Sequence, residues 1–249
     1  MSNPDLSRRG LLLAGGTAAA TPLVAPAQAQ PAPAAGAAPP APHVWEFFQG
    51  EEAAMVSAAV ERLIPADPES PGAIAAGVPQ FIDRQLAGSY GTGNRLYRQG
   101  PFRLGTPEQG YQLPFTPAAL YRAALPAFAA WTRQAHGGAF QDIDHRLQDE
   151  ALRQMEAGEA DFGAVPSAVF FETLLANTVE GFFSDPIHGG NRDMIGWKLV
   201  GFPGPYAGYV ELVGRHNLRF DRQPRGIAQA IAEHAHNATP QSHQTQSHH

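Results

Sequence analysis

The residue types best suited to chemistry are concentrated in one short stretch, residues 185–205, which reads DPIHGGNRDMIGWKLVGFPGP. Its candidate site residues are Asp185, His188, Gly189, Gly190, Asn191, Arg192, Asp193, Trp197 and Lys198. His188 and Asp193 have the side chains of a general acid–base pair, and paired glycines allow a ligand close to the backbone. The stretch offers no evident nucleophile, and one histidine among carboxylates is a poor set of metal ligands.

Two other interpretations give the same stretch no catalytic role. In the first, glycines supply turns with positive φ, and the run Asn191–Asp193 satisfies its own polar groups and nearby carbonyls, which pins a loop to the core. In the second, the pinned loop presents side chains to another protein, and these are His188, Arg192, Trp197 and Lys198. We favour the second interpretation, because arginine and tryptophan commonly anchor protein interfaces.

Composition restricts the chemistry that this chain can perform. The formal net charge is −6 and there is no long basic run, which argues against a nucleic-acid partner. Without cysteine the chain has no thiolate nucleophile, cysteine-ligated iron–sulfur cluster or thioether-linked haem. The nearest candidate for a nucleotide loop, residues 91–96, lacks the third glycine of the dinucleotide fingerprint. Either a cofactor binds at an unrecognised site or it belongs to a partner chain, and we expect none in this chain.

The N-terminus reads as a targeting segment. Arg8 and Arg9 precede an apolar run over residues 11–20, and residues 27–29 read Ala-Gln-Ala, a cleavage-site pattern. Adjacent arginines indicate a twin-arginine signal peptide over residues 1–29, a route that exports folded proteins, although an ordinary secretory leader with two arginines is the alternative. Residues 30–43 follow as a Pro/Ala linker.

Hydrophobic periodicity predicts a mainly α, irregular multi-helix domain over residues 44–226. The expected helices span residues 51–64, 71–86, 116–137, 142–155 and 166–179, and a short strand is expected at 209–213. Two long loops rich in Gly, Pro and aromatic residues, 89–115 and 181–226, are candidates for ligand or protein contact. Residues 227–249 are expected to form a short helix and a disordered histidine-rich tail, with weak metal binding as the alternative.

Several of these segments together carry a family resemblance. The runs DPIHGGNRD at 185–193, GWK at 196–198 and GFPG at 201–204 resemble a signature of the gluconate 2-dehydrogenase subunit 3 family, the small (gamma) subunit. The segments LIPAD at 63–67, PGA at 71–73 and GPF at 100–102 fit the same family in collinear order. The resemblance extends over about residues 44–220, and His188 stands where tyrosine is more usual.

The resemblance implies a non-catalytic subunit of an oxidoreductase complex, and whether the chain is itself an enzyme stays open. In such complexes a glucose–methanol–choline-type flavoprotein large subunit holds FAD, and a membrane-bound multihaem cytochrome c subunit holds haem c. The small subunit exports, folds and stabilises the large subunit. It would lie in the periplasm, attached through the complex to the outer face of the inner membrane. The substrate would be gluconate or a related sugar acid or polyol.

Two rival functions remain open at this stage. One is an independent secreted hydrolase or lyase that uses His188 and Asp193, and the other is a lone periplasmic binding protein. A neighbouring reading frame that encodes a large flavoprotein without its own leader would favour the subunit over both rivals.

Overall fold

The computed structural model describes residues 43–97, 99–103, 105–106, 110–205, 212–218 and 222–238. Over these residues the chain is mainly helical and contains no strand, in agreement with the predicted fold class. The predicted signal peptide with Arg8 and Arg9, almost all of the linker and the end of the histidine-rich tail lie outside the described residues. No helix within the described ranges is long and apolar enough to cross a membrane.

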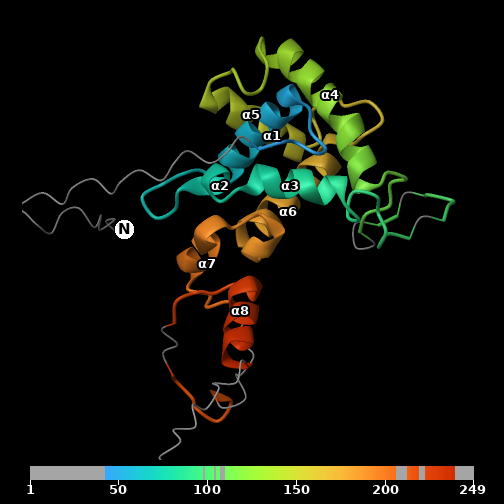
Figure 1. The fold of residues 1–249 in the computed structure, drawn as a ribbon. Coiled ribbons are helices and arrows are strands. Elements are labelled where there is room, and N and C mark those ends of the chain that lie inside the picture. The colour runs from blue at the N-terminus through green and yellow to red at the C-terminus, as the bar shows by residue number, and fades with distance from the viewer. Residues whose placement is uncertain are drawn as a thin grey trace, which may run out of the picture. The chain divides into compact units, whose positions relative to one another are not determined.

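The helices follow one another with connections of very different length (Figure 1). In chain order they are α1 (Gly50–Leu63), α2 (Gly72–Ala75), α3 (Val78–Ala87), α4 (Pro117–His136), α5 (His145–Glu156), α6 (Ser167–Phe183), η2 (Pro186–His188), η3 (Arg192–Met194), α7 (Ile195–Val200) and α8 (Ile227–Ala238). The longest connection described, between α3 and α4, falls in one of the two predicted loops.

Three expectations about the elements need correction. The single helix expected over 71–86 is two helices, because Gly77 adopts a left-handed conformation with φ of 78° and breaks the α-helical path. The helix expected to end at residue 179 continues for another turn to Phe183. The loop expected over 181–226 contains η2, η3 and α7. Most of the strand expected at 209–213 lies outside the described residues.

Helix starts follow local capping chemistry. The Thr116 hydroxyl accepts a hydrogen bond from the backbone N–H of Ala119 at 3.2 Å, and Pro117 takes the first position of α4. In the same way, the Asp144 carboxylate accepts from the N–H of Leu147 at 3.0 Å and starts α5. The α4 boundaries agree with the sequence because the cap, the proline and the closing Gly137 are all local signals.

The core is assembled around α6. This helix packs against α1, α3, α4, α5 and α7, so these five helices share one neighbour. Its buried residues include Phe170, Leu174 and Phe182, and the ring of Phe170 meets that of Tyr121 on α4 edge-on at 5.2 Å between centroids. Because α6 is the common neighbour, its C-terminal end is held rigidly where the candidate site begins.

A buried polar chain ties the loop after α3 to this core. The hydroxyl of Tyr121 donates to the Asn177 side-chain oxygen at 3.0 Å, and the Asn177 amide donates to the Tyr90 hydroxyl at 2.9 Å. Burial raises the pKa of both tyrosines, so the two phenols stay neutral donors and acceptors. The hydrogen bonds from Tyr121 through Asn177 to Tyr90 therefore connect α4, α6 and the start of the 89–115 loop.

A buried carboxylate fastens the first described residues to α3. Asp83 is fully buried and accepts hydrogen bonds from the backbone N–H groups of Glu46, Phe47 and Phe48, each at 2.9 Å, while His43 lies 3.2 Å away. Burial acts to raise the pKa of Asp83, but the three N–H donors and His43 outweigh it and lower the pKa below its usual value. The carboxylate thus holds residues 43–48 in place as an anion.

We predict that Asp83→Asn lowers the free energy of unfolding by about 3 kcal/mol near neutral pH, because an amide nitrogen would face buried N–H donors. Because the folded-state pKa of Asp83 is depressed, its contribution is complete above the unfolded pKa and disappears as pH falls through the folded pKa. Urea unfolding at several pH values should therefore show the gap between wild type and variant closing below about pH 4.

The exposed Asp142, whose side chain makes no hydrogen bond within the described part of the chain, provides the control. Asp142→Asn should change the free energy of unfolding by no more than about 0.5 kcal/mol. Equal losses in the two variants, or a gap that stays constant into acid, would contradict the assigned role of Asp83.

Candidate functional site

The 185–204 segment is organised around the C-terminal end of α6. The last carbonyl groups of any α-helix have no partner inside the helix and need donors from elsewhere. Here, the Ser184 hydroxyl donates to the Gly181 carbonyl at 3.2 Å. The Asn191 amide donates to the Ser184 carbonyl, and the Trp197 indole N–H donates to the Phe183 carbonyl. The sequence segment that follows α6 therefore folds back to close the end of that helix.

Asn191 is the polar residue that closes this turn. Its side chain is fully buried; its amide donates to the Ser184 carbonyl and its oxygen accepts from the N–H of Gly196, both at 2.8 Å. One side chain thereby joins the end of α6 to the start of α7. As expected, Asn191 satisfies a nearby carbonyl and pins the turn to the core, but no side-chain hydrogen bond joins Asn191, Arg192 and Asp193 to one another within the described residues.

The backbone around Asn191 is strained. Asn191, Asp193 and Met194 all have positive φ, at 44°, 53° and 56°, a conformation that side chains other than glycine adopt at a cost of order 1 kcal/mol each. The N–H of Arg192 donates to the Ala76 carbonyl at 3.0 Å, which anchors the strained turn to the end of α2. The strain persists because Asn191 and this backbone bond fix the turn on both sides.

Trp197 supports the turn from inside the protein. Its indole N–H donates to the Phe183 carbonyl at 2.7 Å, its ring meets Phe202 edge-on at 5.1 Å, and only 5% of the residue is exposed. The expectation that Trp197 is presented to a partner is therefore wrong. The tryptophan anchors α7 to the end of α6, because a buried indole needs an acceptor and the helix end supplies one.

Asp185 connects the same region to the last helix. One carboxylate oxygen accepts from the N–H of Ile187 at 3.0 Å and starts η2, and the other accepts from the N–H of Ile227 at 2.8 Å at the start of α8. Asp185 is thus a shared N-terminal cap for two helices distant in sequence. Its negative charge also suits the N-terminal end of α8.

The glycines are required by close approach within the chain. A side chain at Gly190 would collide with the Gly181 carbonyl, and one at Gly196 would collide with the Phe182 carbonyl. Gly189, with φ of 92°, has the guanidinium of Arg84 against it. The paired glycines at 189–190 therefore allow packing of the turn against α6 and α3, and this accounts for them without a ligand.

The remaining candidates, His188, Arg192, Asp193 and Lys198, are exposed. Within the described part of the chain, His188 and Asp193 form neither a hydrogen bond nor an ion pair with each other. The structure therefore does not assemble the acid–base pair that the catalytic interpretation needs. Exposure leaves these four side chains available for contact with another protein, which remains a prediction.

Among the described residues, no three His, Asp or Glu side chains gather closely enough to hold a metal ion. The candidate weak metal site in the histidine-rich tail lies mostly outside the described residues, at His243, His248 and His249.

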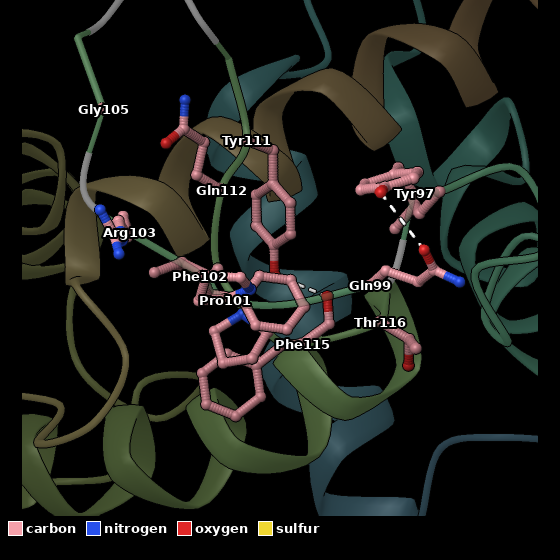
Figure 2. A pocket seen from close by; sticks show the side chains of 13 residues that line it. Tyr97, Gln99, Pro101, Phe102, Arg103, Gly105, Tyr111, Gln112, Phe115 and Thr116 are labelled. Carbon is pink, nitrogen blue, oxygen red and sulfur yellow. Dashed lines mark hydrogen bonds between the residues drawn. The ribbon is translucent and has the colours of Figure 1, made fainter.

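The first long loop forms a second exposed feature. Residues between α3 and α4 line a hollow of about 460 Å³, with Tyr97 and Arg103 on opposite sides in Figure 2. Tyr97 is 83% exposed, whereas the hydroxyl of Tyr111 donates to the Phe115 carbonyl at 2.9 Å. Burial raises the pKa of Tyr111 to about 12, so this wall of the hollow is neutral. An aromatic hollow whose described lining residues include no carboxylate suits contact rather than catalysis.

Sequence reasoning missed Asp83 and the exposed apolar side of α6. Asp83 lies among Phe81, Ile82 and Leu86 in an amphipathic helix, and an acidic residue on the apolar face was the signal that could have revealed a buried carboxylate. Leu175 and Val179 are apolar residues of α6 that stay exposed, and periodicity alone does not say which apolar residues of a helix find a partner.

One comparison with known proteins gives a match. The model of the family described as gluconate 2-dehydrogenase subunit 3 matches residues 50–204, more than half of the chain. This range runs from α1 through Gly204 and includes the loop of Figure 2 and the whole turn around Asn191. No curated protein and no solved structure matches the chain.

We predict that Asn191→Ala lowers the free energy of unfolding by about 2–3 kcal/mol, because it leaves the Ser184 carbonyl and the Gly196 N–H buried without partners. Trp197→Phe keeps an aromatic ring but removes the donor to Phe183 and part of the buried ring volume, so its cost should be similar, about 2–3 kcal/mol. Thermal and urea unfolding followed by circular dichroism measure both.

Lys198→Ala changes an exposed residue of the same helix and serves as the matched control, with an expected effect within about 0.5 kcal/mol. The helix-closing role of Asn191 is refuted if Asn191→Ala melts like Lys198→Ala.

Proposed function

The chain belongs to the gluconate 2-dehydrogenase subunit 3 family, and from this premise we propose its role. It is the non-catalytic small subunit of a membrane-bound, flavin-dependent gluconate 2-dehydrogenase, or of a related sugar-acid or polyol dehydrogenase. It exports, folds and stabilises a glucose–methanol–choline-type flavoprotein large subunit. A membrane-bound multihaem cytochrome c subunit completes the complex.

The observation that carries this proposal is the set of hydrogen-bond partners of the polar groups in the 185–204 segment. Asn191, Trp197 and Asp185 direct their donors and acceptors at backbone groups of their own chain. A catalytic site would direct such groups into a cavity toward a reacting atom. The segment therefore supports a structural and docking role, and the redox chemistry is assigned to FAD in the large subunit and haem c in the cytochrome.

The proposed export role rests on the sequence of the leader. Arg8 and Arg9 ahead of an apolar run are suited to the twin-arginine route, which carries folded proteins. A flavoprotein must bind FAD in the cytoplasm before export, so a folded small subunit with the leader can carry a loaded partner. The complex would then reside in the periplasm, held at the outer face of the inner membrane through its cytochrome subunit.

We predict that replacing Arg8 and Arg9 with lysine retains both this chain and its flavoprotein in the cytoplasm. Co-expression, cell fractionation and immunoblotting of the two chains measure this directly. The physical reason is that the two chains would share one leader and cross only as a folded complex.

Replacing residues 1–29 with a leader for unfolded chains provides the control. This subunit should then reach the periplasm while the flavoprotein remains in the cytoplasm. Periplasmic flavoprotein in the Arg8→Lys, Arg9→Lys cells would rule out the escort role.

A further prediction concerns the isolated subunit. Purified residues 30–249 should show no stoichiometric flavin or haem absorbance and no dehydrogenase activity with gluconate and an artificial acceptor. Activity should appear only in the co-purified complex, in proportion to its flavin content. A chromophore at one equivalent in the folded, isolated subunit would contradict the assignment of the cofactors to the partner chains.

A further inference from the structure

An apolar stripe remains exposed along the same helix that organises the core. Its members on α6 are Leu175, Val179 and Phe183, and Ile187 of the following η2 is exposed as well. The first three recur at one helical turn, the spacing that places side chains on a common face. Exposed apolar residues that form a continuous stripe indicate a contact surface, whereas isolated ones are ordinary.

The stripe borders a hollow shared with α3. This hollow of about 450 Å³ is lined by Val179 and Phe183 of α6, by Phe81 and Gln85 of α3, and by His188 of η2 among others. It lies where the end of α6 meets the strained turn, so its floor is fixed by the buttressing of Asn191 and Trp197. A shallow, mainly apolar hollow of this size has room for a large side chain from another molecule.

Two arginines stand at the Gly189 turn beside the hollow. The guanidinium of Arg84 lies against Gly189, and that of Arg192 lies against Gly77, where a side-chain Cβ would come within 2.8 Å of Nε. A Cβ built on Gly77 would also lie 3.1 Å from the Gly189 carbonyl oxygen. Arg84 and Arg192 therefore both lie next to the turn at Gly189. Both arginines are exposed.

Neither of these guanidiniums has a hydrogen bond or an ion pair within the described residues. By contrast, Arg62 pairs with Asp149 at 2.7 Å and Arg122 pairs with Glu52 at 2.8 Å. Glu180 also lines the hollow but pairs with neither arginine. These two guanidiniums are the cationic groups of this surface, and the nearby carboxylates of Glu180 and Asp193 leave their donors unused.

We propose that the stripe, the hollow and the two arginines form one docking surface for the large subunit, which we call the α3–α6 surface. The partner places an apolar or aromatic side chain in the hollow and a carboxylate between Arg84 and Arg192. This inference rests on the proposed function and adds to it the place of contact and the chemistry that the partner must present.

Charge complementarity favours an acidic partner segment over a second copy of this chain. In a two-fold contact, a second copy would bring the same pair of unpaired guanidiniums to the interface, whereas carboxylates of the large subunit would neutralise the pair already present. Arginine suits this role because its planar donors match a carboxylate in two-point contact. The apolar stripe around them would exclude water and strengthen that contact.

The test measures binding of purified subunit variants to the flavoprotein large subunit of the same complex by biolayer interferometry. Val179→Ser and Phe183→Ser should each weaken binding by at least about thirtyfold, as expected of central interface residues. Arg84→Glu with Arg192→Glu should weaken it at least as much. It should also flatten the salt dependence of the association rate.

Matched controls come from other surfaces. Ile74→Ser on α2 removes an apolar side chain that is 47% exposed, and Arg146→Glu on α5 makes a charge reversal at another exposed arginine. Both should leave the affinity within about twofold. Because Phe183 also contacts Phe182, the milder Val179→Ser keeps the test valid if Phe183→Ser is poorly folded by circular dichroism.

The outcomes separate this proposal from the proposed function. If the wild-type subunit does not bind the large subunit at all, the proposed function fails and this inference fails with it. If wild type binds and folded Val179 and arginine variants bind equally well, only the α3–α6 surface is wrong. Loss of binding in Phe102→Ser alone would move the contact to the loop of Figure 2. Dimerisation of the isolated subunit that Val179→Ser abolishes would assign the surface to self-association.

Discussion

The last carbonyl groups of α6, which have no hydrogen-bond partner inside the helix, are the constraint on which the rest of this structure depends. A helix that ends inside a protein must find donors for its last carbonyls. The chain supplies them from residues that follow, through Ser184, Asn191 and Trp197. The glycines, the positive φ angles and the short α7 are consequences of bringing these donors within reach. The stretch with the candidate site residues, 185–205, is thus explained in large part by helix termination.

The same helix connects the stability of the core to the candidate contact surface. α6 packs against α1, α3, α4, α5 and α7, and its Asn177 joins the buried tyrosines of α4 and the long loop. α3, which forms the other wall of the α3–α6 surface, is fixed in turn by Asp83 and the backbone of residues 46–48. The exposed surface therefore lies on two helices whose buried sides are rigidly held, which favours precise docking.

Local signals in the sequence predicted the fold class and most helix boundaries. Features that depend on contacts between distant residues could not be predicted from the sequence. The caps at Thr116 and the glycine after α4 are read from neighbouring residues, so α4 was predicted correctly. The break at Gly77 and the burial of Trp197 depend on residues far along the chain, namely the 189–192 turn and the end of α6. An exposed or buried tryptophan has the same sequence pattern, and only the packing distinguishes them.

Folding and partner recognition are coupled in this arrangement. The hollow beside Phe183 and the placement of Arg84 and Arg192 on either side of the Gly189 turn exist only after the turn has closed on α6. An unfolded subunit would have the same residues without the surface that they form together. Under the proposed function, a partner that binds the α3–α6 surface would therefore select folded subunits. Such selection is suited to an export route for folded proteins, because the chain with the leader would take up its cargo only once it has itself folded.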